Sequence, residues 1–166
     1  MGMVAEQSTV VTLDRARLFE ESRMGQAVIS QLEQASNDLI SENRRLEAAL
    51  EAEERQLTQQ RATMTPEVFR DLAREFDTRV EELRVAQEAK GRALTRAREA
   101  EQQRFFETAI PVLVALMEDL GAVAIIDRSV VILSFDRIDI TTEAIARLDA
   151  AFDAGAVPSA PETPKP

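Results

Sequence analysis

The stretch GAVAIIDRSVVILSF, Gly121–Phe135, contains two apolar runs separated by the polar residues 127–129. This order predicts a β-hairpin with strands near 122–126 and 130–135. A strand with one face in water alternates apolar and polar residues, whereas here the odd and the even positions are both apolar. Both faces of the predicted hairpin therefore need to be covered by other parts of the protein.

A long helical hairpin precedes this stretch. We expect a first strand at 8–14 and then a helix over residues 15–63, because leucines recur there at heptad spacing. Thr65 is a suitable N-cap, and Pro66 a suitable first residue, for a second helix. The apolar seam of this helix continues to Pro111, where we expect a kink or a short break. The two helices are predicted to pack as an antiparallel coiled coil.

The C-terminal part of the chain supplies two short helices. The apolar helix 111–120 is predicted to end at Gly121, a suitable C-terminal cap. Thr141 or Thr142 can cap a last amphipathic helix that reaches Phe152.

The sequence thus predicts an α+β fold: a body of residues 8–14 and 111–152, an antiparallel helical arm of residues 15–110, and a disordered proline-rich tail of residues 153–166. The strands and short helices of one body are too few to cover a sheet that is apolar on both faces. We therefore expect strands from several copies to close into an oligomeric β-barrel. The residues expected in this interface are Val11, Leu13, Val123, Ile125, Val131 and Leu133.

Apolar residues off the seam of the arm are candidates for binding a partner. An arm that is two helices thick leaves such side chains partly exposed, and an exposed methionine adapts to variable partners. Phe69 lies on the seam but close to the turn, and it can serve either role. The candidate binding residues are Ile29, Ile40, Met64, Val68, Phe69 and Val85.

The seam turns polar in the middle of the arm. Pairing of the two helices back from the predicted turn places Asn43 opposite Gln87 or Ala86, and Leu39 opposite Lys90. Polar seam residues fix register at a cost in stability, and a glycine inside a helix costs about 1 kcal/mol relative to alanine. This layer either forms a hinge or only sets the register. The candidate hinge residues are Asn43, Gln87, Lys90 and Gly91.

The composition limits the classes of function. The 166 residues are typical of one domain, and 30 acidic against 20 basic residues give a formal net charge of −10, which argues against a nucleic-acid partner. The absence of cysteine and histidine excludes thiol chemistry, imidazole bases and the usual zinc sites. Acidic runs such as Glu51, Glu53 and Glu54 are typical of a solvated face. With no nucleophile–base pair and no phosphate-binding glycine loop, we expect no enzymatic activity, cofactor or metal.

The sequence contains no transmembrane run and no signal-peptide core. Residues 1–7 fit either the start of a cytosolic protein or residues added ahead of a mature exported chain, and the lack of cysteine is compatible with both.

Both ends of the predicted fold resemble a known family. The segment 9–34, TVVTLDRARLFEESRMGQAVISQLEQ, resembles the start of the Skp (OmpH-like) family of periplasmic chaperones: a strand followed by Asp14, Leu18, Phe19, Ser22 and Gly25. The segment 120–148, LGAVAIIDRSVVILSFDRIDITTEAIARL, resembles the closing block of that family. With the helical hairpin between them, the resemblance covers roughly residues 8–152.

The resemblance implies a homotrimer in the periplasm, with a small β-barrel body and three helical tentacles around a cavity. Members of the family hold unfolded outer-membrane proteins there without ATP. Their best-known members are strongly basic, which is linked to contact with anionic lipid, whereas this chain is acidic and has Lys90 and Lys165 as its lysines. Contact with lipopolysaccharide is therefore not expected to carry over.

Two other classes of protein fit parts of the pattern. A prefoldin-like cytosolic chaperone has the same body-and-tentacle plan, but its strands lie between the long helices, whereas here the arm lies between strands. A structural coiled-coil adaptor fits the helices but gives no reason for exposed apolar side chains.

Overall fold

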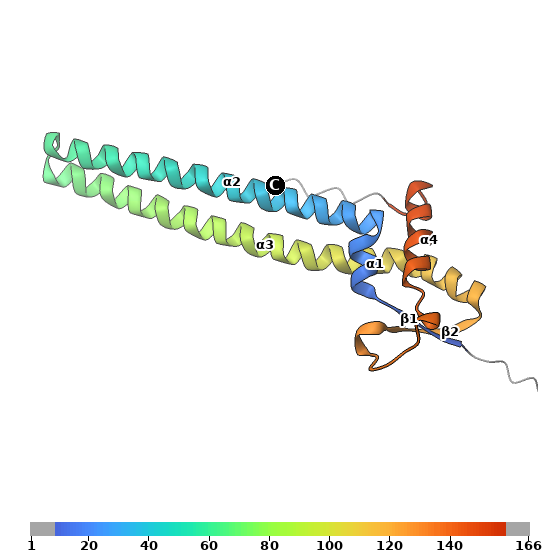
Figure 1. The fold of residues 1–166 in the computed structure, drawn as a ribbon. Helices are drawn as coiled ribbons and strands as arrows, with labels where there is room; N and C mark the ends of the chain where they lie inside the picture. The colour runs from blue at the N-terminus through green and yellow to red at the C-terminus, as the bar shows by residue number, and fades with distance from the viewer. Residues whose placement is uncertain (1–8, 159–166) are drawn as a thin grey trace, which may run out of the picture. The chain divides into compact units, whose positions relative to one another are not determined.

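The computed structural model describes residues 9–158 of the chain (Figure 1). The elements in chain order are β1 (Thr9–Leu13), α1 (Arg15–Glu21), α2 (Arg23–Gln60), the 3₁₀ turn η1 (Arg61–Thr63), α3 (Pro66–Leu120), β2 (Ala122–Asp127), the 3₁₀ turns η2 (Arg128–Val130) and η3 (Asp136–Ile138), and α4 (Thr141–Asp153).

The described chain divides into two units. The body consists of residues 9–31 and 99–158, and the arm consists of residues 32–98. The sequence placed these boundaries closer to the strands, at 14/15 and 110/111. The body is larger because side chains of α1, of the start of α2 and of the middle of α3, such as Leu18, Met24 and Phe105, belong to its core.

The sheet of the body has two parallel strands, β1 and β2, with Val11 opposite Ile125. Parallel strands need a long crossover, and the chain between Leu13 and Ala122 supplies it. The predicted β-hairpin is therefore wrong: β2 forms, but the second apolar run does not pair as a strand in the described part of the chain. Directly after β2 the backbone turns, because the Asp127 carboxylate accepts a hydrogen bond from the Ser129 N–H at 2.9 Å.

The free edge of β1 is occupied by a segment close to α4. Thr12 forms a bridge with Asp139, and the Ile140 N–H donates to the Thr12 carbonyl at 2.9 Å. The edge that a hairpin partner could have taken is thus filled from the far end of the chain.

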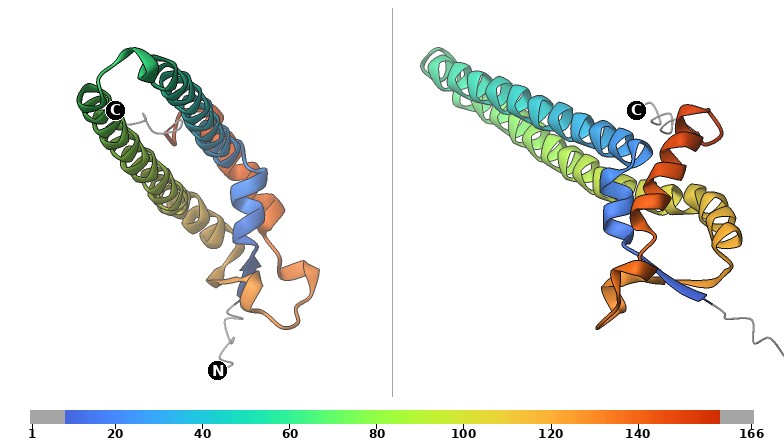
Figure 2. Two further views of the ribbon diagram at one scale, coloured as in Figure 1. Left: turned by 90° about the vertical axis from the view of Figure 1, so that its left-hand side faces the viewer. Right: turned by 45° about the vertical axis from the view of Figure 1, so that its right-hand side comes forward.

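The core of the body brings together both ends of the described chain. Leu18 of α1, Leu116 of α3 and Leu148 of α4 are fully buried, and α4 lies beside α1 (Figures 1 and 2). The expected apolar face of the last helix is confirmed. Phe19 packs edge-to-face on Phe105 with ring centroids 4.9 Å apart. The buried cluster comprises Val11, Leu13, Leu18, Met24, Phe105, Ala109, Leu116, Ile140, Ala144, Leu148 and Val157.

Val157 corrects the predicted extent of the tail. The sequence placed the start of a disordered tail at residue 153, but Asp153 ends α4 and Val157 is buried in the core. An apolar side chain four residues beyond the helix is enough to hold the chain against the body. The rest of the predicted tail, residues 159–166, lies outside the described residues.

The first long helix is interrupted at Ser22, which the sequence analysis missed. Asp14 caps α1, because its carboxylate accepts from the Arg17 N–H at 3.0 Å. The chain then leaves the helix at Ser22, whose hydroxyl accepts from the Gly25 N–H at 3.2 Å. Only glycine fits at position 25, because a Cβ atom there would lie 1.7 Å from the Phe19 carbonyl oxygen.

α3 begins and ends where the sequence predicted, and it runs through Pro111 without a break. The Thr65 hydroxyl accepts from the Val68 N–H at 3.4 Å and Pro66 is the first helical residue, while Gly121 ends the helix with φ +61. Of the two outcomes expected at Pro111, a kink or a short break, the break is absent, since α3 continues to Leu120. Buried residues on either side of Pro111, Ala109 and Leu116, hold this part of the helix in the core.

The arm is an antiparallel pair formed by the distal parts of α2 and α3 (Figures 1 and 2). Ion pairs join Glu53 to Arg79, and Glu42 to Lys90 at 2.7 Å. No side chain between residues 32 and 98 is fully buried, because two helices alone cannot enclose their seam.

Candidate functional site

The arm exposes apolar side chains as the sequence predicted. Ile40 is 44% exposed, and Val68 and Val85 are each 49% exposed. Met64 and Phe69 are half-buried at the turn between the two helices. Ile29, the remaining predicted binding residue, is half-buried and lies in the body rather than the arm.

Two arginines surround the apolar residues at the turn. A hollow of about 340 Å³ is lined by Arg61, Met64, Pro66, Phe69 and Arg70; we call it the tip hollow. The Arg61 guanidinium lies over the Phe69 ring, 5.3 Å from its centroid. The Arg70 Nε donates to the Pro66 carbonyl at 3.3 Å. Met64 and Phe69 were predicted from the sequence, but neither arginine was; their positions close to the turn were the available signal.

The middle of the arm contains the expected polar layer. Asn43 Oδ1 and Gln87 Oε1 are buried and have no hydrogen-bond partner within the described residues. Lys90 pairs with Glu42, so its ammonium group is satisfied at the surface. Gly91 is half-buried, and a Cβ atom there would meet no other atom within 4 Å. The layer therefore contains two side-chain oxygens that lose hydrogen bonds to water on burial and gain none from the described residues.

The body carries a second set of exposed apolar residues, on β2 and on the segment that follows it. Val123 is 59% exposed, Leu133 91% and Phe135 72%. Of the residues expected between copies, Ile125 and Val131 are half-buried. The other two, Val11 and Leu13, are buried by their own chain, so their burial does not require a second copy. Three strongly exposed residues of the same segment were not among the predicted interface residues: Val130, Ile132 and Phe135.

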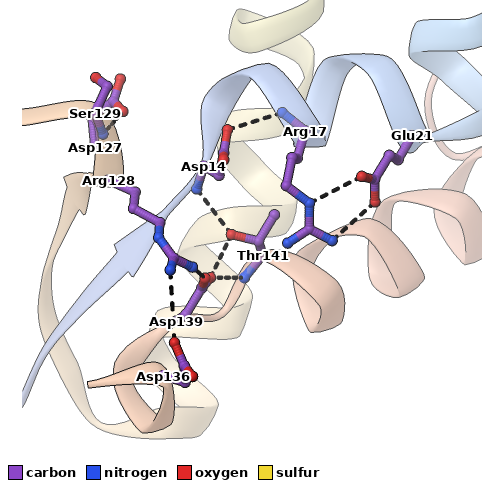
Figure 3. A network of polar contacts seen from close by, with 9 residues as sticks. All are labelled: Asp14, Arg17, Glu21, Asp127, Arg128, Ser129, Asp136, Asp139 and Thr141. Carbon is purple, nitrogen blue, oxygen red and sulfur yellow. Dashed lines mark hydrogen bonds and ion pairs between the residues drawn. The ribbon is translucent and has the colours of Figure 1, made fainter. Parts of the chain in front are cut away.

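A polar network holds the base of this exposed segment (Figure 3). The Thr141 hydroxyl accepts from the Asp14 N–H at 2.9 Å and donates to Asp139 Oδ1, which also accepts from the Thr141 N–H at 2.9 Å. Arg128 forms ion pairs with Asp139 and, at 3.6 Å, with Asp136. The segment 128–139 is thereby closed at its two ends.

The network also corrects the predicted cap of the last helix. We expected Thr141 or Thr142 to be the N-cap, but Ile140 occupies that position and Asp139 supplies the carboxylate that accepts from the first turn. Burial alone would raise the pKa of Asp139; the hydrogen bonds from Thr141 and Arg128 outweigh burial and hold the pKa below its ordinary value.

Residues 9–158 contain no cluster of three or more acidic side chains placed to hold a metal ion. In the same range, no helix combines the length and the apolar character that crossing a bilayer requires.

The chain is similar to one protein family and to a solved structure. A family described as "Outer membrane protein (OmpH-like)" matches residues 9–148. A crystal structure of a proposed outer membrane chaperone (OmpH-like) from Caulobacter crescentus CB15 superimposes with a TM-score of 0.74 and 22% sequence identity, covering 86% of this chain and 85% of that one. No curated protein matches the sequence.

Proposed function

The chain belongs to the OmpH-like family, and on this premise we propose that it is an ATP-independent holdase chaperone, which binds unfolded outer-membrane proteins in the periplasm and keeps them from aggregating. The observation that carries the proposal is the exposure of Ile40, Val68 and Val85 on an arm without a fully buried side chain. Such side chains can contact an unfolded chain at many weak points, and many weak contacts bind without a deep pocket. The description of the Caulobacter crescentus protein as a chaperone supports the same reading.

We propose that the working form is a homotrimer assembled through the body. β2 is paired with β1 on one edge, and no other strand among residues 9–158 pairs with its second edge, which a strand from another copy can therefore take. Val123, Leu133 and Phe135 are strongly exposed apolar side chains of the kind that marks an interaction surface, and strands from three copies that close into a barrel would cover them. Three arms then enclose the cavity that holds the client.

We also propose that the polar layer of the arm is a hinge that adapts the cavity to clients of different size. Asn43 and Gln87 contribute buried oxygens without partners, and Gly91 contributes backbone freedom within the same stretch. A layer with unsatisfied buried polar groups is expected to open more easily than its neighbours.

The charge of the chain shapes how it holds clients. With a net charge of −10, binding of an acidic client depends mainly on apolar contacts, so added salt should not release it. Neither nucleic acid nor lipopolysaccharide is part of the proposal, because both are polyanions.

The test is suppression of aggregation without nucleotide. An outer-membrane β-barrel protein is diluted from urea into buffer with and without the full chain, and light scattering is followed. We expect the chain to abolish the rise in scattering. A variant with Ile40, Val68 and Val85 replaced by serine should lose much of this effect while its circular dichroism is unchanged.

A matched control replaces three exposed polar residues of the arm, Gln34, Gln56 and Gln59 of α2, by serine, and it should protect the client as well as the unmodified chain. If the unmodified chain leaves scattering unchanged, a structural coiled-coil adaptor becomes the better reading. Fractionation of cells that express the natural gene tests the periplasmic location.

A further inference from the structure

We infer that the tip hollow selects client segments in which a bulky apolar side chain stands directly beside a carboxylate. The inference rests on the proposed holdase function and names the kind of segment that the tip of the arm recognises. It follows from the presence of three apolar residues and two arginines in the lining of one hollow.

The tip hollow is small, and three of its five lining residues are apolar. Met64, Pro66 and Phe69 line a space of about 340 Å³, which is at the small end of ligand pockets. A space of this size accepts one large side chain and not a folded element. Methionine and phenylalanine favour an aromatic or long aliphatic occupant, because sulfur–aromatic and aromatic–aromatic contacts add to burial.

The other two lining residues of the hollow are cationic. Arg61 comes from η1 and Arg70 from the first turns of α3, and both line the same space. The Pro66 carbonyl and the Phe69 ring each hold one of the guanidinium groups near the hollow. A guanidinium group has several N–H donors in one plane, so these contacts leave others for a carboxylate.

The competing partner of Arg70 is weak. Glu67 lies 3.6 Å from Arg70, but the two side chains are 74% and 67% exposed, and an exposed pair of this kind contributes at most about 1 kcal/mol. A client carboxylate that enters together with a buried apolar group is partly shielded from water, so it competes well for the same arginine.

The surroundings strengthen the local preference. The sequence has no acidic residue between Glu54 and Glu67, although the whole chain carries a net charge of −10. Between these two glutamates the chain carries Arg55 and Arg61, whereas Arg70 is flanked by Glu67 and Asp71; the turn is thus locally less acidic than the rest of the chain. A segment that is only acidic is repelled by the scaffold, and a segment that is only apolar makes no use of the arginines. The combination of both features binds best.

The experiment uses three decapeptides of otherwise identical sequence. One ends in phenylalanine with a free carboxylate, one ends in the same residue as the amide, and one ends in serine with a free carboxylate. The full chain carries ¹³C-methyl methionine, and the Met64 signal is assigned with a Met64→Leu variant. We expect the phenylalanine acid to shift the Met64 signal and to bind about two- to fivefold more tightly than the amide for each arginine engaged.

Variants identify the residues responsible. Arg61→Gln and Arg70→Gln should each reduce the preference for the acid over the amide, and the double variant should abolish it. Arg74→Gln removes the same charge one turn further along α3, outside the tip hollow, and should leave the preference intact. All of these side chains are exposed, so circular dichroism should show an unchanged fold.

Equal binding of acid and amide, or a Met64 signal that no peptide shifts, overturns the inference. A preference that survives in the double variant overturns it as well. Aggregation suppression, measured on the same protein samples, distinguishes failure of the tip inference from failure of the proposed holdase function. If suppression persists while the peptide preference is absent, the tip inference alone fails. If suppression is also absent, the proposed holdase function fails.

Discussion

The hydroxyl of Thr141 accepts a hydrogen bond from the backbone N–H of Asp14 at 2.9 Å, although 127 residues separate them in the chain. The hydroxyl belongs to the first residue of α4, and the N–H belongs to the residue that caps α1. One buried side chain therefore joins the two ends of the body, and it also donates to Asp139.

Replacement of Thr141 by valine should destabilise the body. Valine has nearly the same shape but leaves the Asp14 N–H and the Asp139 carboxylate without this partner, which costs about 1–3 kcal/mol. Urea unfolding followed by circular dichroism measures the loss. Thr142→Val is the matched control: Thr142 is exposed, so its change should be within about 0.5 kcal/mol. Equal effects of the two substitutions would contradict the role given to Thr141.

Acid should weaken the same network. Asp139 has a pKa lowered in the folded chain, so its contribution to stability is present above the ordinary aspartate value of 3.8 and is lost as the pH falls through the lower, folded-state value. We expect the urea midpoint to fall as the pH drops below about 4. In Asp139→Asn the midpoint is lower at neutral pH and falls less with acid. A parallel pH dependence in the two proteins would exclude Asp139 as the group that titrates.

Two glycines should respond in opposite directions to alanine. At Gly25 the added Cβ atom would lie 1.7 Å from the Phe19 carbonyl oxygen, so the break between α1 and α2 must distort, at a cost of about 1–3 kcal/mol or more. At Gly91 the added atom has open space, and the gain in helix propensity is up to about 1 kcal/mol. Urea midpoints of the two variants measure both effects. A stable Gly25→Ala variant would show that the break at Ser22 is not required.

Hydrogen exchange should locate the weak layer of the arm. Amides near Asn43 and Gln87 should exchange faster than those near Leu50 and Leu83, because the polar layer contains two buried oxygens without a hydrogen-bond partner within the described residues. Replacing Asn43 and Gln87 together by leucine should slow exchange there and raise the melting temperature. The seam leucines Leu50 and Leu83, one from each helix, provide the internal references in each sample. Uniform protection along the unmodified arm would contradict the hinge and would mean that the layer only sets the register of the two helices.

Solution mass tests assembly through the body. We expect light scattering to give the mass of three chains for the unmodified protein. Leu133→Asp should yield monomers, because the side chain is 91% exposed in the single chain but would bring an unpaired charge into an interface between copies, at a cost of several kcal/mol. Val85→Asp, on the exposed face of the arm, should leave the mass unchanged. A monomer formed by the unmodified chain would remove the basis of the proposed barrel.

Local signals in the sequence predicted the helical part of the fold well. Thr65 and Pro66 mark the start of α3, Asp14 caps α1 and Gly121 follows the last residue of α3, each through atoms only a few residues apart. The leucine seam likewise indicated an antiparallel arm. Such features depend on neighbours in sequence, so the chain itself displays them.

The errors involve partners far apart in sequence. The pattern of 121–135 described two strands but could not show that β1 pairs in parallel with the first, or that Asp139 fills the other edge of β1. The interruption at Ser22 depends on how closely Gly25 approaches Phe19, which no periodicity reveals. At the candidate site, apolar residues were found from their position off the seam. Arg61 and Arg70 were missed because charged residues near a turn are common.

The parallel pairing of β1 with β2 also sets the order in which the chain can fold. β1 ends at Leu13 and β2 begins at Ala122, so the sheet cannot form until the whole arm has left the ribosome. The two helices of the arm can begin to pair at the turn that joins them. Pairing can then extend away from the turn while the C-terminal residues are still being made. The body closes last, when Leu148 and Val157 arrive to complete its core. Until then Val11 and Leu13 remain open to water, and the nascent chain exposes the same kind of apolar surface that the finished protein is proposed to shield in others.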